Sequence, residues 1–300
     1  MAILFSLFGK YFCRNITTFD YPFKHEEPAH HRVRCRRLLI LSFAAFSFSF
    51  AGFERMPEPP AVYADGMSSL FAGDVDFFML NPSAAASIQS LHASVFYSPS
   101  PFDLPQLSNG GLAIAVPTEW FETGYAVTST GYSLYKELTA TAVFARSFGI
   151  ISGGCNINYN HLRIEGYGDA AAVGIDLAVS VQMSDDIRWG VSLLNINRPS
   201  IGREKELLPQ WYLTGITCQF LSTASVSFTM IKDVMYPLSV RTGVKFSPID
   251  IIDFQVGVSS DPSRYYAGIG INYMSLSVRY SMATHADLGL THTIGLSFSL

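Results

Sequence analysis

Apolar and polar residues alternate with a period of two through the chain from about Ser87 to Leu300. Between Val173 and Met183, for example, the odd-numbered residues are apolar and the even-numbered residues are small or polar. The stretches 238–246, 274–282 and 294–300 show the same pattern. Successive side chains of a β-strand point to opposite faces, so each stretch predicts a strand with one apolar and one polar face. No segment after residue 87 has helical spacing, and the predicted fold class is all-β.

The connections between the predicted strands alternate in length. Tight turns such as 117–118 and 149–150 alternate with longer loops such as 98–109 and 196–210. Short periplasmic turns and longer extracellular loops are typical of barrels in the bacterial outer membrane, and we expect both chain ends on the periplasmic side. A spanning strand needs about 9 to 11 residues. The sequence therefore predicts a transmembrane antiparallel β-barrel of about 14 strands over residues 87–300, with its apolar face toward lipid, in a Gram-negative bacterium.

A secreted soluble β-sandwich is the alternative, because alternation alone does not say whether the apolar face meets lipid or a core. Soluble strands have about 5 to 6 residues, which is shorter than the strands predicted here. The polar faces carry mostly Ser, Thr, Gly and Asn. Aromatic residues also gather near predicted strand ends, as in interfacial girdles: Trp120, Phe121, Trp211, Tyr212, Tyr236, Tyr265 and Tyr266. These features favour the barrel.

The apolar stretch 38–52 is shorter than the about 20 residues that a spanning helix needs. Four arginines precede it, and Ser49 and Ala51 supply small residues for a signal peptidase. We therefore expect residues 1–51 to be a leader with a signal peptide, cleaved after Ala51. The sequence Val62-Tyr63-Ala64 is an alternative cleavage site, farther from the apolar stretch. Residues 1–32 are long and partly acidic for such a leader, which suggests that translation begins at Val33 and that 1–32 belong to a mis-called start. A true extended leader is the alternative.

Composition excludes several classes of function. Charged residues make up 15% of the chain, against about 25% in a typical soluble domain, and the net charge of -4 gives no basic surface for nucleic acid. Cys155 and Cys218 would remain after cleavage, without the spacing of a metal site. No His-Glu-x-x-His, Gly-x-Ser-x-Gly or Walker motif is present. We therefore expect a monomeric protein that is not an enzyme and has no cofactor or metal.

Residues 52–86 do not alternate and contain the dipeptide Asn81-Pro82, so we expect a short plug or periplasmic segment. The passage GMSSLFAGDVDFFMLNPSAAAS, residues 66–87, resembles the N-terminal signature of the PorV/PorQ group of FadL-related outer-membrane proteins. The resemblance continues in YKELTATAVFARSFG from Tyr135, IEGYGDAAAVGIDLAV from Ile164, LPQWYLTGI from Leu208 and LGLTHTIGLSFSL from Leu288. The chain departs from that group in having Ser68 and Ser69 in place of glycines, Ser83 in place of Ala, and Leu300 in place of Phe.

This resemblance implies a fourteen-stranded barrel whose N-terminal segment plugs the lumen. It also implies two possible roles, namely transport of hydrophobic molecules across the outer membrane or service to type IX secretion by binding secreted proteins. A purely structural outer-membrane protein is a further alternative. Alternation places four charged residues on the lumen side, where internal salt bridges or a transport path would use them: Asp176, Arg241, Lys245 and Arg279.

Overall fold

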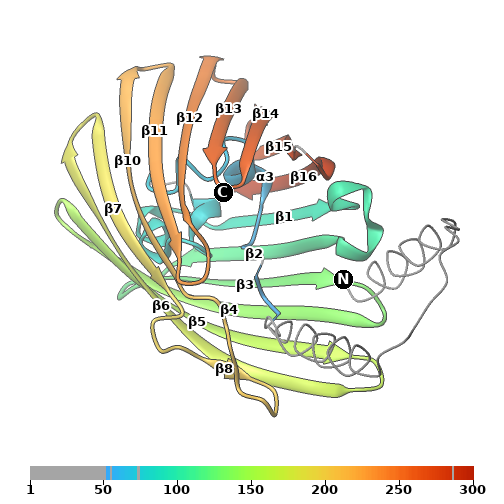
Figure 1. Cartoon of the computed structure of the whole chain (residues 1–300). Helices are drawn as coiled ribbons and strands as arrows, with labels where there is room; N and C mark the ends of the chain where they lie inside the picture. Colours follow the sequence, from blue (N-terminus) through green and yellow to red (C-terminus); the bar gives the residue numbers. More distant parts are fainter. Residues whose placement is uncertain (1–51, 55, 73–74, 286) are drawn as a thin grey trace, which may run out of the picture. The chain divides into compact units, whose positions relative to one another are not determined.

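The computed structural model describes residues 52–54, 56–72, 75–285 and 287–300. The expected leader 1–51, including residues 1–32 and Val33, lies outside the described residues. Fourteen antiparallel strands form a closed barrel (Figure 1), which confirms the predicted fold class. The strands are β1 (His92–Ser98), β2 (Asn109–Pro117), β3 (Glu122–Gly131), β4 (Tyr135–Phe148), β5 (Ile151–Ile164), β6 (Gly168–Ser184), β7 (Ile187–Leu194), β10 (Trp211–Leu221), β11 (Ala224–Asp233), β12 (Leu238–Ile249), β13 (Ile252–Ser260), β14 (Ser263–Tyr273), β15 (Leu276–His285) and β16 (Gly289–Ser299).

Each strand pairs with its neighbour in sequence, and β1 pairs with β16 to close the ring. In that seam Val95 lies opposite Leu296 and His92 lies opposite Ser299. A closed ring leaves no strand edge with unpaired backbone groups, which is the condition for crossing a bilayer with strands. Within the described part of the chain, no helix is both long enough and apolar enough to span a membrane.

The two ends of the barrel differ in their connections. At the short-turn end, the strands from β2 onward join through tight turns such as 149–150 and 222–223. At the long-loop end, the β1–β2 loop contains the 3-10 helices η3 (Pro101–Asp103) and η4 (Pro105–Leu107). The β7–β10 loop, also at the long-loop end, contains a small hairpin of β8 (Ser200–Ile201) and β9 (Glu206–Leu207).

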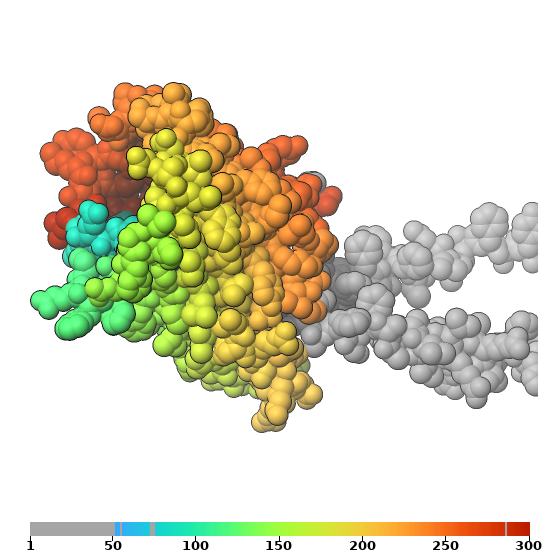
Figure 2. Space-filling model, turned by 90° about the vertical axis from the view of Figure 1, so that its left-hand side faces the viewer, coloured from blue at the N-terminus to red at the C-terminus, as the bar shows by residue number. Residues whose placement is uncertain are grey.

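The outward face of the strands is apolar. Several apolar residues at positions predicted to face outward are 50–55% exposed: Leu112, Val173, Val256 and Ile294. Figure 2 shows the green, yellow and orange strands as one continuous outer surface. Among the aromatic residues expected at strand ends, five are exposed: Trp120, Phe121, Tyr212, Tyr236 and Tyr265. The expectation was wrong for Trp211 and Tyr266, which are 8% and 5% exposed and point inward.

The described residues of 52–88, namely 52–54, 56–72 and 75–88, run through the barrel from one end to the other, and we call them the plug. Phe53 packs against Ile201 and Leu208 of the longest loop, so the plug begins at the long-loop end. The expectation that both chain ends lie on the periplasmic side was therefore wrong for the start of the described chain, because the plug crosses the lumen before the first strand. It continues through the helix α3 (Pro60–Tyr63) and the 3-10 helix η1 (Val75–Phe77). It ends in the 3-10 helix η2 (Pro82–Ser87), which packs against β4, β5 and β6. Figure 1 shows this blue-to-cyan segment inside the ring of strands.

The first strand begins later than the alternation suggested. We expected the strands to begin at about Ser87, whereas residues 82–87 form η2 and β1 starts at His92. The small residues Ala84 and Ala85 are almost fully buried between the plug and the wall. A compact 3-10 turn brings them there, which an extended strand would not do.

Candidate functional site

The lumen is the candidate functional site, because the plug lies directly against the inner wall. Glycines on the inner faces of the strands allow this close approach. An added Cβ at each of seven glycines would come within 3.0 Å of a plug atom: Gly154 (Pro82), Gly190 and Gly215 (Phe71), Gly243 and Gly257 (Asp65), Gly268 (Ala64) and Gly295 (Pro60). The wall is therefore shaped to fit this particular segment.

One side of the plug forms an apolar core with β7, β10 and β11. Leu70 and Phe71 of the plug are at most 1% exposed and pack in one cluster with Trp211, Leu213 and Ile231. Burial of a large apolar side chain contributes about 1.5–3 kcal/mol. This core explains why Trp211 points inward.

The dipeptide Asn81-Pro82 and the next residue, Ser83, form hydrogen bonds within the plug and to the barrel wall. The Nδ2 of Asn81 donates to the backbone oxygen of Leu70 at 2.9 Å, and the hydroxyl of Ser83 donates to the Oδ1 of Asn81 at 2.6 Å. The hydroxyls of Ser83 and Ser180 lie 2.5 Å apart, which links η2 to β6. Pro82 is the first residue of η2, where a missing N–H is tolerated.

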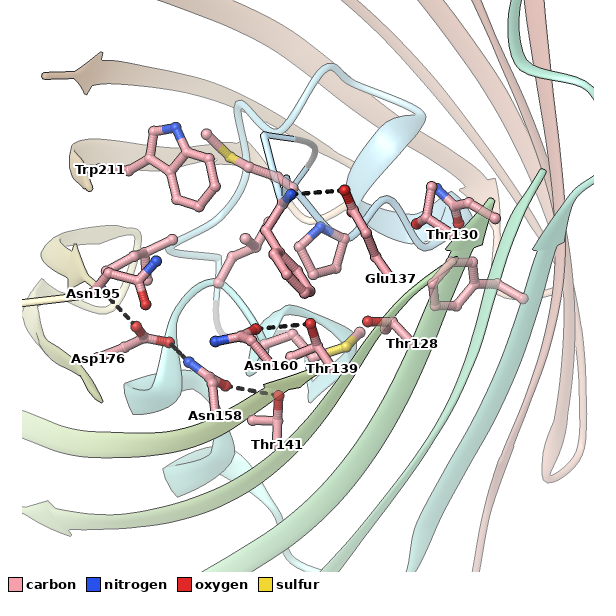
Figure 3. Close-up of a pocket in the computed structure, with 18 residues that line it drawn as sticks. Thr128, Thr130, Glu137, Thr139, Thr141, Asn158, Asn160, Asp176, Asn195 and Trp211 are labelled. Atoms are coloured by element: carbon pink, nitrogen blue, oxygen red, sulfur yellow. Dashed lines mark hydrogen bonds between the residues drawn. The ribbon is translucent and has the colours of Figure 1, made fainter. Parts of the chain in front are cut away.

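Asp176 lies at the centre of an amide network on β5 and β6 (Figure 3). Its carboxylate accepts hydrogen bonds from the Nδ2 of Asn158 at 2.6 Å and from the backbone N–H of Asn195 at 2.8 Å. The Nδ2 of Asn156 reaches the same carboxylate at 3.3 Å and the plug oxygen of Phe78 at 3.0 Å. Because Asp176 is 2% exposed, the network replaces its hydration with fixed donors.

The other three predicted lumen residues lie on the opposite wall. The Nη2 of Arg279 forms an ion pair with Asp253 at 3.0 Å, and the Nη1 of Arg241 donates to the plug oxygen of Gly66 at 3.0 Å. Lys245 faces inward on β12, and its positive charge acts on Asp65 of the plug. The structure therefore does not bring Arg241, Lys245 and Arg279 together with Asp176.

Asp65 is a buried carboxyl group in the middle of the plug, 1% exposed. Burial raises its pKa to about 6, although a hydrogen bond from Ser69, one from the backbone of Ser68 and the charge of Lys245 act in the opposite direction. Its Oδ1 has no hydrogen-bond partner among the described residues. The plug therefore carries a carboxyl group that resists ionisation.

A second plug carboxylate, Asp76, was not singled out from the sequence, nor was its partner. The Nε2 of His92 lies 3.0 Å from the Oδ1 of Asp76, at the short-turn end. Burial acts to raise the pKa of Asp76, but His92 and the charge of Arg279 hold this pKa below its usual range. Asp253 was also missed, although the alternation that places Asp176 inward places Asp253 inward as well.

A cavity of about 70 Å³ separates the start of the plug from the wall (Figure 3). Its polar wall consists of Thr and Asn side chains such as Thr139, Thr141 and Asn160. Phe53, whose backbone N–H donates to Glu137 at 2.8 Å, covers it from the long-loop side. Binding pockets for small molecules usually have about 300–1,000 Å³, so a ligand of ordinary size fits only if the plug moves.

No group of three or more His, Cys, Asp or Glu side chains that could hold a metal ion occurs in the part of the chain that the structure describes.

The barrel is similar in fold to three solved structures. The toluene transporter TbuX of Ralstonia pickettii has a TM-score of 0.62 and 11% identity, covering 83% of this chain and 100% of that one. The toluene transporter TodX of P. putida has a TM-score of 0.57 and 8% identity, covering 82% and 99%. A FadL homologue of Pseudomonas aeruginosa has a TM-score of 0.54 and 13% identity, covering 80% and 96%. No family model and no curated protein matches the sequence.

Identities this low establish a shared fold and nothing more. The chain therefore has the fold of a FadL-like barrel with a plugged lumen.

Proposed function

We propose that this protein is an outer-membrane transporter that moves small hydrophobic molecules through its lumen when the plug shifts. The observation that carries the proposal is the path of the plug, which fills the lumen from the long-loop end to the short-turn end. The cavity of about 70 Å³ beside the start of the plug is too small for passage, so transport through this part of the lumen requires displacement of the plug. TbuX and TodX, which share this fold, are toluene transporters, and this supports the choice of substrate class.

The outward apolar face supports the outer membrane as the location. We propose that the mature chain begins near Gly52, that the expected segment 52–86, which makes up most of the plug, closes the lumen, and that the barrel is monomeric. Cell fractionation followed by N-terminal peptide mass spectrometry tests the location and the cleavage site together. Recovery of peptides from residues 1–32 in the mature protein would contradict both the proposed start at Val33 and the cleavage after Ala51.

A disulfide between the plug and the wall tests the transport proposal. The adjacent hydroxyls of Ser83 and Ser180 make S83C/S180C a suitable pair, placed in a C155S/C218S background so that no other thiol reacts. Purified protein in liposomes should admit toluene when reduced, lose this flux when oxidised, and regain it with reductant. The C155S/C218S parent is the control and should not respond to oxidant. Equal flux in the oxidised and reduced double-cysteine protein would contradict the proposal.

Membership in the PorV/PorQ group and a role in type IX secretion form the second candidate function. The observation that favours it is a set of exposed apolar side chains at the long-loop end, among them Tyr167, Leu207, Val234 and Met235, which are 58–91% exposed. Such residues suit contact with a secreted protein. Deletion of the gene should then reduce the amount of secreted cargo at the cell surface. An unchanged secreted proteome would exclude this role.

A further inference from the structure

A cavity of about 350 Å³ opens at the short-turn end, between the end of the plug and the strands β4 to β7. The helix η2 lines one side of it, and the exposed residues Gly149 and Ile150 of the β4–β5 turn line another. Among the lining residues are five serines and two glutamines. Small-molecule pockets usually have about 300–1,000 Å³, so a ligand fits this cavity without displacement of the plug.

Arg188 of β7 brings one positive charge to this cavity. No acidic residue of the described ranges lines it. Asp185 and Asp186, in the adjacent β6–β7 turn, are exposed and lie outside the lining. A positive charge without a carboxylate beside it favours an anionic ligand over a neutral or a cationic one.

The guanidinium group of Arg188 is held in place but keeps donors for a ligand. Its Nε donates to the Oε1 of Gln182 at 2.6 Å, and its Nη1 donates to the backbone oxygen of Ala72 at 3.1 Å. Gln182 is fixed in turn, because its Nε2 donates to the backbone oxygen of Ser184 at 2.7 Å. Arg188 forms no ion pair within the described part of the chain. Both hydrogen bonds go to neutral oxygens, and the remaining N–H groups can form strong charge-assisted hydrogen bonds with a carboxylate.

The serines add groups that both donate and accept hydrogen bonds. The hydroxyls of Ser147 and Ser152 lie 2.8 Å apart, and the hydroxyl of Ser147 also lies 3.4 Å from the backbone oxygen of Ala86. A serine hydroxyl has one donor and two acceptor positions, so this pair keeps acceptor positions for a ligand. A molecule with several hydroxyl groups can therefore replace the water that this wall would otherwise bind.

We propose that this cavity binds a small carboxylate that carries several hydroxyl groups, such as a sugar acid. The carboxylate pairs with Arg188, and the hydroxyl groups pair with the serines. A neutral sugar would leave the half-buried guanidinium without a counter-charge. An acid with an apolar ring would take the serine hydroxyls out of water without replacing their hydrogen bonds.

This inference goes beyond the proposed function, because the ligand is hydrophilic and binds beside the end of the plug. The proposed function enters only through the orientation of the barrel, which would open this cavity to the periplasm. Binding is measured on the purified protein and requires no transport. Binding and flux can therefore fail independently.

Calorimetry at neutral pH on the purified barrel tests the proposal with three probes that share a six-membered ring. D-glucuronate carries the carboxylate and the hydroxyl groups, D-glucose only the hydroxyl groups, and cyclohexanecarboxylate only the carboxylate. An amine-oxide detergent is used, because the sugar headgroup of a maltoside would compete with the probes. We expect D-glucuronate to bind more tightly than either other probe by about tenfold or more, since a hydrogen bond to a charged group contributes about 1.5–3 kcal/mol.

Two variants assign the two kinds of contact. R188Q should weaken D-glucuronate by about tenfold or more and leave D-glucose unchanged. S152A should weaken D-glucuronate and D-glucose by about threefold, the effect of one hydrogen bond between neutral groups, and leave cyclohexanecarboxylate unchanged. R203Q, in the exposed β7–β10 loop at the opposite end, is the matched control and should bind all three probes like the parent. If R188Q does not fold, Q89W serves in its place, because a large side chain at this exposed lining position should obstruct the cavity and weaken D-glucuronate.

Equal or tighter binding of D-glucose or of cyclohexanecarboxylate to the parent would overturn the proposal. The absence of binding of any probe would overturn it as well. Unchanged binding of D-glucuronate to R188Q, or to Q89W where that variant is used, would place the ligand elsewhere and would also overturn it. Flux of toluene without binding of D-glucuronate overturns this inference and leaves the transporter proposal intact.

Discussion

Two neighbouring glycines on β5 provide a residue-scale test of how closely the plug fits the wall. An added Cβ at Gly154 would overlap the backbone of Pro82, whereas at Gly153 nothing lies within 4 Å. We therefore predict that G154A destabilises the barrel by about 1–3 kcal/mol, the usual cost of overpacking, and that G153A does not. Thermal unfolding in detergent, followed by the gel shift of the heated barrel, measures the difference. Equal midpoints for the two variants would contradict the described plug position.

Asp65 provides a second residue-scale prediction, because its pKa is raised from 3.8 to about 6 by burial. Below pH 3.8 the carboxyl group is protonated in both the folded and the unfolded chain, so its ionisation does not reduce the free energy of unfolding. As the pH rises to 6, only the unfolded chain releases the proton, so the folded state loses stability. At about 1.4 kcal/mol per pKa unit, the loss is about 3 kcal/mol above pH 6.

The variant D65N should not show this loss. We predict that its thermal midpoint exceeds that of the parent at pH 7.5 and approaches it near pH 4. Parallel melting curves in detergent across this range provide the measurement. The His92–Asp76 pair is present in both proteins, so its titration cancels in the comparison. A difference in midpoint that is independent of pH would contradict the role of Asp65.

At the scale of elements, the β8–β9 hairpin is predicted to hold the start of the plug rather than the barrel. Phe53 packs against Ile201 and Leu208, next to this hairpin. Replacing residues 200–207 by a short Gly/Ser loop should therefore speed protease cleavage near Phe53 and leave the heat-modifiable barrel band unchanged. Limited proteolysis with N-terminal sequencing detects the site. Loss of the barrel band would show that the hairpin supports the wall instead.

The strands could be predicted from the sequence because lipid-facing and lumen-facing residues differ so strongly in polarity. The same contrast placed Asp176, Arg241, Lys245 and Arg279 on the inner side. The contrast in polarity did not predict that Trp211 points inward. The plug presents apolar residues to β10, so the inner face of this strand near Trp211 is apolar as well. The contacts of the plug join residues that are far apart in the sequence. The alternation of polarity along one strand does not indicate which of these distant residues meet inside the lumen.

At the scale of the whole molecule, the apolar outer face of the strands forms a belt that should contact the acyl chains. A charged substitution on this belt should destabilise the barrel more at the bilayer centre than near the bilayer surface. Leu177, in the middle of β6, is 41% exposed on the outer face. We predict that L177R costs about 2–4 kcal/mol in lipid and that A171R, on the same strand and face but nearer the long-loop end, costs about 0–1 kcal/mol. Folding yield into liposomes of defined thickness checks this. Equal yields would argue that the belt does not contact acyl chains.

The position of the plug also determines the order in which the molecule can be assembled. The ring closes only where β1 meets β16, and β16 ends at Ser299, whereas the plug precedes every strand. While the sheet is still an open ribbon, the plug is already synthesised and available as a surface for the inner side chains to collapse on. Pairing of β16 with β1 can then close the barrel around a plug that is already in place. Assembly in this order requires no intermediate with an empty, water-filled lumen.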